Sequence, residues 1–347
     1  MTHAARRTGP QHLVRSLLAT RLIRAGLFAC VILASSAASA QETAAQFPSR
    51  DITLIVPFGA GGPPDVIARV VAAGLSQNLG KPVIVENRPG ANTALAEKAV
   101  ARAAPDGYTL MAIDISFTVT PHIASNLGVD PFKDFRPVGL SAKSVFTLVA
   151  APTLGTRTIA DFLTLAKQKG QEIKIGHTGV GTTPHLAAMT FIKATGINPL
   201  LVPYRTVTEA TTNVLAGEIS AVFSAASTAV GLANDQRASV LGVTGSQRLK
   251  SLPNIPTFEE AGIKMTGFED GSWYGVAAPA ATPDAIVAKL NAALRATVEN
   301  QATRDRLAAL GVALSGDTPE EFGAFLKSQY GYWGDTLRAA GIEPEAK

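Results

Sequence analysis

The apolar residues of this 347-residue chain follow two periods in turn, one typical of strands and one typical of helices. Ile52–Val56 is a short apolar run, and after a glycine-rich stretch the apolar residues recur at helical spacing over 65–79. The series continues with a strand, a helix and a strand at 83–85, 94–103 and 109–113. Such alternation is typical of right-handed βαβ units with a parallel sheet.

A second series of the same kind begins with a strand at Phe146–Ala150. It predicts helices at Ile159–Lys169, 184–194 and 208–216, and strands at 173–176, 220–224 and 239–244. The C-terminal part is predicted to be mostly helical, over 283–299 and 319–340. Two similar halves predict an α/β protein of two lobes, with a ligand cleft at the carboxyl ends of the strands.

The first 40 residues have the pattern of a secretory signal peptide. Five arginines and no acidic residue precede an apolar run at 25–33, which is too short to span a membrane. Small residues at 38–40 suit cleavage after Ala40. The pair Arg6-Arg7 leaves twin-arginine export open beside the general secretory route. We therefore expect a periplasmic protein.

Removing the leader changes the charge of the chain. The whole sequence has 31 basic and 27 acidic residues, a formal charge of +4. The leader holds five of the basic residues, so the mature chain keeps 26 basic against 27 acidic residues and a charge of −1. This balance gives no support for nucleic-acid binding. The one cysteine, Cys30, is also in the leader, which excludes disulfides and thiolate metal sites from the mature chain.

The glycine-rich loop at 58–62 joins the first strand to the first helix. Glycine lets the backbone turn sharply and point several N–H groups at one place, and the helix start adds the positive end of its dipole. These features are typical of an anion site.

The same loop also resembles part of a dinucleotide-binding fingerprint. Gly59 and Gly61 follow a strand, and Glu86 stands at the end of the next strand, but Pro64 replaces the third glycine. A secreted oxidoreductase that uses nicotinamide or flavin therefore remains open at this point, as does a purely structural turn.

A second glycine-rich loop, at 176–184, occupies the matching place in the second half of the chain. Thr183 suits the N-cap of the following helix, and Pro184 suits its first position, where a missing N–H costs little. Two such loops, one in each half, predict a clamp that holds one anion between the lobes.

Catalytic and metal chemistry find little support in the sequence. Outside the leader the histidines are His122, His177 and His185, and the G-x-S-x-G and S-x-x-K nucleophile patterns are missing. H-E-x-x-H and calcium-loop spacings are missing as well. His185, in the first turn of its helix, either donates to a ligand or caps its own structure. We expect no catalytic residue, no metal and no cofactor.

Asp114, just after the third strand, is the acidic residue of greatest interest. It is either a turn residue or a carboxylate that faces the cleft. In the cleft it would repel a second carboxylate of a ligand and favour an amine, amide or hydroxyl. Trp273 and Tyr274 are further candidates for the cleft wall, with burial in the core as the simpler expectation.

Several longer stretches resemble the substrate-binding proteins of tripartite tricarboxylate transporters, the TctC or Bug family of extracytoplasmic solute receptors. The resemblance runs from about Phe47 to Glu345. It is carried by PSRDITLIVPFGAGG at 48–62, PVIVENRPGA at 82–91, AAPDGYTL at 103–110, DPFKDFRPVGL at 130–140, APAATPDAIVAKLN at 278–291 and AAGIEPE at 339–345.

The resemblance implies a receptor with a two-lobed, type II periplasmic-binding-protein fold. Its α/β lobes would be joined by two crossing strands and would close on a small carboxylate. Residues 41–145 and 272–347 would form the first lobe, and residues 146–271 the second. The implied partners are a small organic acid and the membrane subunits of the transporter, and the receptor is expected to be a monomer.

The resemblance also implies the ligand contacts by matching position. In such proteins the first loop holds a carboxylate mainly through backbone N–H groups and ordered water, and the second loop adds hydroxyls and N–H groups. The predicted ligand-binding residues are Phe58, Gly59, Ala60, Gly61, Gly62, Asp65, Asp114, Ser116, Gly176, Thr178, Gly181, Thr182, Thr183, His185 and Ser224. Neither loop contains an arginine, so an arginine clamp is not expected.

The chain departs from the family pattern at several of these places. Pro63-Pro64 replace the usual Ser-Thr, which removes two hydroxyls and two N–H donors from the first loop. Asn92-Thr93 replace a Gly-Gly pair, Ser224-Ala225 replace Asp-Asn, and Asp114 replaces a small or hydroxyl residue. The pocket is therefore predicted to be reshaped, and a common di- or tricarboxylate cannot be assumed as its ligand.

Together these observations predict a non-enzymatic periplasmic receptor that binds a dicarboxylate, amino acid or aromatic acid by hinge closure. The alternatives are a secreted enzyme, either an oxidoreductase that uses the first loop for a nucleotide or substrate phosphate or a hydrolase, and a receptor that serves signalling.

Overall fold

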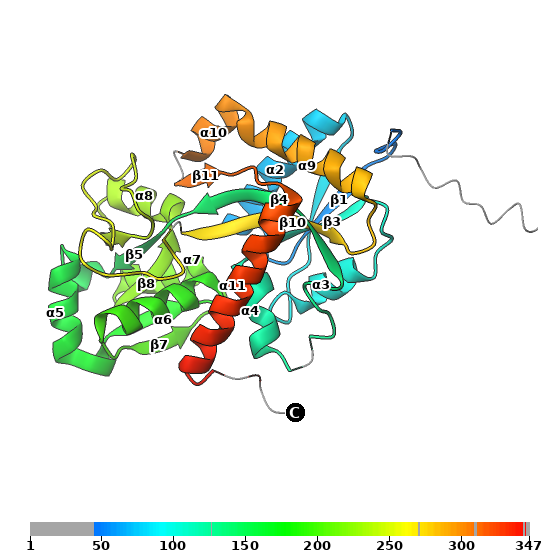
Figure 1. The fold of residues 1–347 in the computed structure, drawn as a ribbon. Helices are drawn as coiled ribbons and strands as arrows, with labels where there is room; N and C mark the ends of the chain where they lie inside the picture. Colours follow the sequence, from blue (N-terminus) through cyan, green and yellow to red (C-terminus); the bar gives the residue numbers. More distant parts are fainter. Residues whose placement is uncertain (1–44, 126, 270, 309–310, 343, 345–347) are drawn as a thin grey trace, which may run out of the picture. The chain divides into compact units, whose positions relative to one another are not determined.

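Two β-sheets with helices packed against each of them make up the fold. The computed structural model describes residues 45–347 except 126, 270, 309–310, 343 and 345–347. The predicted leader and its cleavage after Ala40 therefore lie outside the described residues. Residues 48–347 form one unit that contains both sheets (Figure 1). None of the helices that the structure describes is long and apolar enough to cross a bilayer.

The first sheet has six strands in the order β11-β4-β10-β3-β1-β2. They are β1 (Ile52–Val56), β2 (Val83–Asn87), β3 (Thr109–Asp114), β4 (Phe135–Ser144), β10 (Ser272–Pro279) and β11 (Val312–Leu314). Strands β2 and β3 pair with β1 in parallel, as the βαβ pattern predicts. Strand β10 runs antiparallel to both β3 and β4. The parallel pairing predicted for the strands within 52–113 is therefore confirmed. The remaining strands of the sheet pair antiparallel, so the sheet as a whole is mixed.

Helices cover both faces of the first sheet. They are α2 (Pro63–Leu79), α3 (Ala94–Ala101), α4 (Ile115–Ile123), α9 (Asp284–Glu299), α10 (Gln301–Ala308) and α11 (Pro319–Ala339). Leu54 lines a small cavity with residues of α2, whereas its neighbour Ile55 packs in a core cluster with Ala96 and Val100 of α3. Because successive strand residues point to opposite faces, α2 and α3 lie on opposite sides of the sheet.

The second sheet has five strands in the order β7-β6-β8-β5-β9. They are β5 (Phe146–Ala150), β6 (Lys174–His177), β7 (Leu200–Pro203), β8 (Ala221–Ala225) and β9 (Ser239–Val243). Its helices are α5 (Ile159–Lys169), α6 (Thr183–Thr195), α7 (Val207–Ala216) and α8 (Ala226–Asn234), with 3₁₀ turns at Pro152–Leu154 and Gly170–Glu172. Phe191 contacts both Phe162 and Phe223, at ring-centroid distances of 6.4 and 5.7 Å, and these buried rings centre the core of this lobe.

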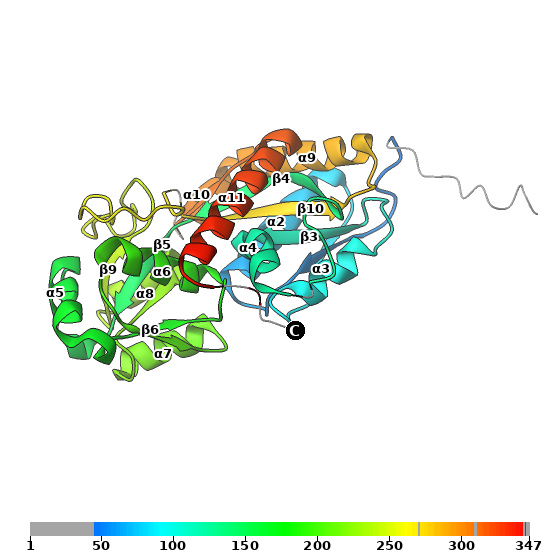
Figure 2. The ribbon, with the colours of Figure 1, turned by 60° about the horizontal axis from the view of Figure 1, so that its bottom comes forward.

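The two sheets are connected where two strands lie side by side. A single residue, Val145, separates β4 of the first sheet from β5 of the second. The chain enters the first sheet again at β10, whose first residue, Ser272, pairs with Ser144 at the end of β4 (Figure 2). The two strands therefore form a paired crossing between the lobes, which suits a hinge.

The periodicity of the apolar residues predicted both ends of some helices and strands correctly and missed other strands. Ile52–Val56, Phe146–Ala150 and Ile159–Lys169 have the predicted ends. Strand β10 was missed because it is buried at every position and shows no alternation. Strand β4 was missed because it contains Pro137 and Gly139, which weaken a strand signal.

We predict that Gly271→Ala destabilises the crossing between the lobes. Gly271 has a φ of +80°, and a Cβ placed there would lie 2.3 Å from the backbone oxygen of Ser144. We expect a loss of about 3 kcal/mol or more in the free energy of unfolding, from left-handed strain together with overpacking against backbone. Gly262→Ala is the matched control, since Gly262 has a φ of +76° but open space around it.

The control should lose about 1–2 kcal/mol, the cost of the left-handed backbone alone. Denaturant unfolding of both variants measures the difference. Equal losses in the two variants would show that the close approach to Ser144 does not matter.

Candidate functional site

A cavity of about 620 Å³ lies between the ends of strands from both sheets, and we call it the interlobe cleft. From the first lobe it is lined by residues 58–64, Asp114, Ser116 and Tyr274. From the second lobe it is lined by Phe146, Thr178, Thr182, Thr183, Pro184, residues 205–208, Thr211, Thr212, Leu215, Ala225, Thr228, Leu232 and Arg237. The volume suits a small molecule. Both predicted loops thus reach one cavity.

The carboxylate of Asp65, which is almost fully buried, holds the first loop by hydrogen bonds on the side away from the cleft. One carboxylate oxygen accepts the backbone N–H of Gly61 at 2.9 Å and Nε of Arg69 at 3.0 Å. The other accepts Nδ2 of Asn87 at 2.8 Å, and the same amide nitrogen donates to the backbone oxygen of Phe58 at 3.0 Å. Asp65, predicted as a ligand contact, therefore lies beneath the loop and not in the cleft lining.

These bonds also set the charge state of Asp65. Burial disfavours its charged form, but the hydrogen bonds from Arg69, Gly61 and Asn87 outweigh burial and lower its pKa. The carboxylate is thus ionised, and it consumes the N–H of Gly61. Pro63 and Pro64, the first two residues of α2, have no N–H at all. The first loop keeps its shape with fewer donors for an anion.

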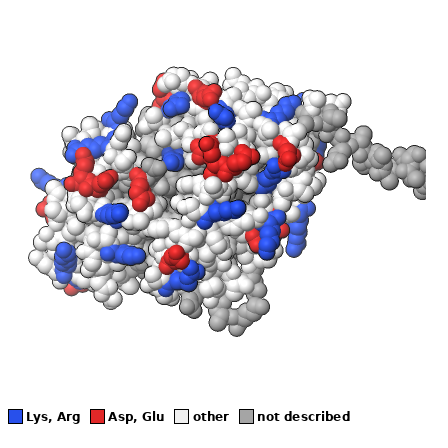
Figure 3. Space-filling model, in the orientation of Figure 1, with Lys and Arg blue, Asp and Glu red and all other residues white. Residues whose placement is uncertain are grey.

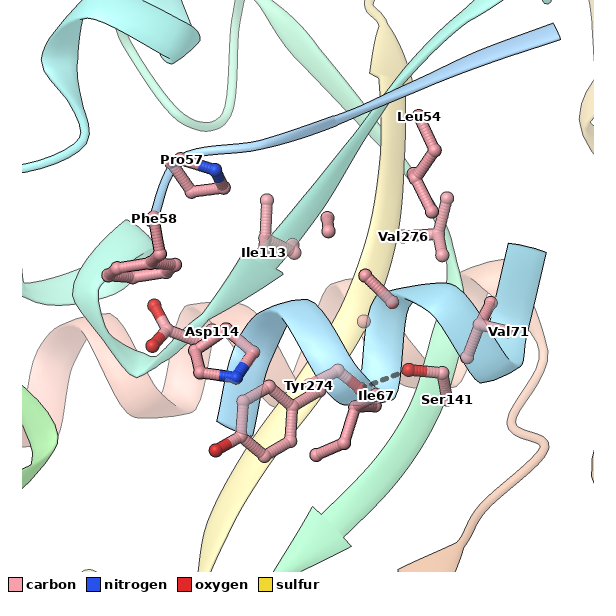
Figure 4. A pocket seen from close by; sticks show the side chains of 14 residues that line it. Leu54, Pro57, Phe58, Ile67, Val71, Ile113, Asp114, Ser141, Tyr274 and Val276 are labelled. Atoms are coloured by element: carbon pink, nitrogen blue, oxygen red, sulfur yellow. Dashed lines mark hydrogen bonds between the residues drawn. The ribbon is translucent and has the colours of Figure 1, made fainter. Parts of the chain in front are cut away.

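Asp114 is the N-cap of α4, and its Oδ1 accepts the backbone N–H of Ser116 at 3.0 Å. It is 5% exposed and lines the cleft. Behind it lies an apolar cavity of about 10 Å³, which Figure 4 shows with Phe58 and Tyr274 beside the carboxyl. Burial is the main cause that raises the pKa of Asp114 to about 7, against the lowering effect of Ser116.

A second buried carboxyl, Glu97, lies near Asp114. It accepts the hydroxyl of Thr93 at 2.6 Å, and burial together with the charge of Asp114 raises its pKa to about 7. Asp114 also faces Tyr274 across the β3–β10 pair, and burial followed by the Asp114 charge raises the pKa of that phenol. Trp273 packs against Phe322 and Phe325 in the core, as the simpler expectation had it.

The second loop is closed by its own hydrogen bonds. His185 does not line the cleft, and its Nδ1 accepts the N–H of Gly181 at 3.3 Å, so it caps its own loop. Burial, and then the charge of His177, lowers the pKa of His185 to about 4. The N-cap of α6 is Thr182, one residue before the predicted Thr183, and its hydroxyl donates to the backbone oxygen of Gly179 at 2.8 Å.

The structure brings together ten of the predicted site residues. Phe58, Gly59, Ala60, Gly61, Gly62, Asp114, Ser116, Thr178, Thr182 and Thr183 line the cleft, while Asp65, Gly176, Gly181, His185 and Ser224 do not. Gly176 is packed closely, since a Cβ there would lie 2.7 Å from the side chain of Ile219. Ser224 is fully buried in β8.

Sequence reasoning missed the part of the cleft contributed by the start of α7. Thr206 caps this helix by accepting the N–H of Glu209, and Arg205 precedes it in the lining. Arg237 lines the cleft as well. The signal was the pattern Thr206-x-x-Glu209, which is typical of a helix start. An arginine clamp was not expected, because neither glycine-rich loop contains arginine, and the two arginines of the lining lie outside those loops.

Three further features bear on whether the described part of the chain holds a second site. Within the described residues, no group of three or more His, Cys, Asp or Glu side chains is placed to hold a metal ion. Glu86, the acidic residue of the dinucleotide-like pattern, is exposed and pairs with Arg88 at 2.6 Å. A groove of about 810 Å³ between α6 and α11 contains His185 but none of the other predicted site residues.

Comparison with known proteins supports the same picture. Residues 67–342 match the family model TctC, the tripartite tricarboxylate transporter family receptor. A UPF0065 protein of Bordetella pertussis is 32% identical over 318 residues, which cover 91% of this chain and 96% of that protein.

Solved structures share the two-lobed α/β fold. The periplasmic binding protein BugD has a TM-score of 0.78 and 30% identity, covering 86% of this chain and 100% of its own. Rpa4515 of R. palustris, solved with adipate, has a TM-score of 0.79 and 29% identity, covering 86% and 99%. MatC from Rhodopseudomonas palustris, with bound malate, has a TM-score of 0.73 and 29% identity, covering 84% and 100%.

We predict that Asp65→Asn destabilises the protein by about 1–3 kcal/mol, because three donors lose a charged acceptor at a buried site. Arg69→Gln should cost less than Asp65→Asn, since the Arg69 side chain is half exposed and its ion pair is screened by solvent. Denaturant unfolding at neutral pH measures both. The advantage of the parent over Asp65→Asn should vanish as the pH falls through the lowered pKa of Asp65. A penalty that persisted in strong acid would contradict this role.

We predict that His185 makes the protein sensitive to acid. Its pKa of about 4 lies below the ordinary value of 6.5, so the unfolded chain takes up a proton first, and stability falls as the pH drops through this window. His185→Gln keeps an acceptor for Gly181 but cannot be protonated. Its free energy of unfolding should therefore decline less between pH 7 and pH 4.5 than that of the parent. Parallel pH profiles would show that His185 is not responsible.

Proposed function

The chain belongs to the tripartite tricarboxylate transporter receptor family, as its sequence predicted, and from this premise we propose that it captures a small organic carboxylate in the interlobe cleft. The lobes close on the ligand, and the loaded receptor delivers it to the membrane subunits of a transporter. We place the receptor in the periplasm as a monomer. The relatives in this family are binding proteins and not enzymes.

One observation carries the proposal: two strand-to-helix loops, one from each sheet, line the same cavity. Helix starts favour anions, and the starts of α6 and α7 both reach this lining. The two related structures contain adipate and malate, which are small dicarboxylates. The paired crossing of β4 and β10 supplies a short connection about which the lobes can move.

The alternatives gain no comparable support. An oxidoreductase would use Glu86 to bind a ribose hydroxyl, but Glu86 pairs with Arg88 outside the cleft lining. On the face shown in Figure 3, basic and acidic side chains are interspersed, which does not favour nucleic acid on that face. A signalling receptor would use the same cleft, so it differs in its partner and not in its ligand chemistry.

We predict that a bulky side chain at Thr212 blocks ligand binding. Thr212 is an exposed residue of α7 that lines the cleft, and its hydroxyl donates to the backbone oxygen four residues earlier. Thr212→Trp should weaken carboxylate binding at least tenfold in calorimetry. Thr164→Trp is the matched control, because Thr164 makes the same bond on α5 and lies outside the cleft.

The parent and the control should bind alike, and both should contract in solution scattering when ligand is added. The first screen uses native mass spectrometry for retained ligand, followed by adipate, malate, amino acids and aromatic acids. Carboxylate binding that survives Thr212→Trp undiminished would place the site elsewhere and refute the proposal.

A further inference from the structure

We propose that the interlobe cleft is polarised and that its ligand is a small acid with one carboxylate and a protonated amine at opposite ends. The carboxylate binds the second-lobe wall near Arg205 and the start of α7. The amine binds Asp114 on the first-lobe wall. This inference rests on the proposed function, because it names the ligand class of the same cleft.

The first-lobe wall has lost much of its capacity for an anion. Pro63 and Pro64 supply no N–H, and the N–H of Gly61 is donated to Asp65. Asp65 is ionised below the loop, and Asp114 adds a second carboxyl that reaches the cleft itself. A ligand carboxylate on this wall would therefore meet an acidic group and only those N–H groups of the loop that Asp65 and the prolines leave.

Asp114 is placed to accept a donor from the ligand. Its Oδ1 takes the N–H of Ser116, which leaves capacity on the carboxyl for a further bond. The hydroxyl of Ser116, 1% exposed and in the same lining, is close enough to Asp114 to help lower the pKa of that carboxyl. The lone pairs of this hydroxyl remain acceptors for a ligand. Asp114 and Ser116 together offer acceptors to a protonated amine.

The second-lobe wall has the opposite character. Arg205 and Arg237 bring two positive charges to the lining, and the N-terminus of the ten-residue helix α7 lies beside Arg205. The carboxylate of Glu209 is occupied by the backbone N–H of Arg205 and does not line the cleft. Thr211, 6% exposed on α7, has a hydroxyl without a partner among the described residues, and it lines the cleft.

Calorimetry with ligands of matched length tests the polarity. The six-carbon set is 6-aminohexanoate, 6-hydroxyhexanoate, hexanoate and adipate, and the four-carbon set is 4-aminobutyrate, 4-hydroxybutyrate, butyrate and succinate. In the set whose length fits, the amino acid should bind at least tenfold more tightly than the dicarboxylate. The hydroxy acid should lie between them, since a neutral donor gains less from a carboxylate.

Two variants assign the ends of the ligand. Asp114→Asn keeps the N-cap of α4, since asparagine caps as well as aspartate. It should remove the preference for the amine, whereas Asp130→Asn, which alters a similar bond to the backbone N–H of Phe132, should not. Arg205→Gln should weaken every carboxylate in the set. Arg157→Gln should not, although Arg157 precedes a threonine N-cap in the same way at α5.

The unmodified protein gives an independent measurement. Burial holds the pKa of Asp114 near 7, with Glu97 and Tyr274 as the titratable groups that face it. An amine favours ionised Asp114, so affinity for the amino acid should rise between pH 6 and pH 8. A dicarboxylate needs Asp114 protonated, so its affinity should fall over the same range.

The outcomes separate this inference from the proposed function. If dicarboxylates bind as tightly as amino acids, or if the two pH trends coincide, the polarity is wrong while carboxylate capture stands. If Thr212→Trp leaves carboxylate binding intact, the cleft is not the site and both fail. Tenfold selectivity for the amino acid that Asp114→Asn abolishes supports the inference.

Discussion

Strand β10 is the constraint on which both walls of the cleft depend. It pairs with β3 so that Tyr274 stands opposite Asp114, and its first residue carries a hydroxyl 3.4 Å from that of Thr183 on α6. Strand β10 therefore contacts the first-lobe wall at Tyr274, beside Asp114, and the second-lobe wall at Ser272, beside Thr183. Gly271, whose position leaves no room for a Cβ, lets the chain enter that strand against the end of β4. The geometry of the cleft follows from this crossing.

The shape of the first loop and its anion chemistry are separate properties here. A glycine-rich loop at a helix start can bind an anion through its free backbone N–H groups. It can instead donate those N–H groups to acceptors within the protein, which hold the loop in place. Asp65 takes one N–H and, with Asn87, fixes the backbone at Phe58. The loop is consequently held by its own hydrogen bonds, while the two prolines reduce the number of N–H groups that it offers a ligand. The ligand selectivity of the cleft can therefore differ while the conformation of the loop stays the same.

The sequence could predict the family, both loops and several elements, because these depend on local pattern. Ile159–Lys169 has a capping box at its start and an amphipathic face, so residues within and next to the helix determine where it begins and ends. Arg205 could not be placed, since the strand before it, β7, is four residues long and has no buried position. The sequence also could not show that Asp65 and His185 support their own loops and do not line the cleft. Each bonds within its own loop, and only the path of the backbone shows it.

Two departures from the family pattern prove to be connected in space. Asn92 and Thr93 occupy left-handed backbone at φ of 50° and 76°, where glycine would be unstrained. Glycine could not make the hydrogen bond that offsets this strain, in which the Thr93 hydroxyl donates to the carboxyl of Glu97. The charge of Asp114 in turn raises the pKa of that buried carboxyl. Replacing this pair with glycines would relax the backbone but leave Glu97 with one donor fewer. The acid in the cleft and the strained turn behind it therefore belong to one unit, and neither is an isolated substitution.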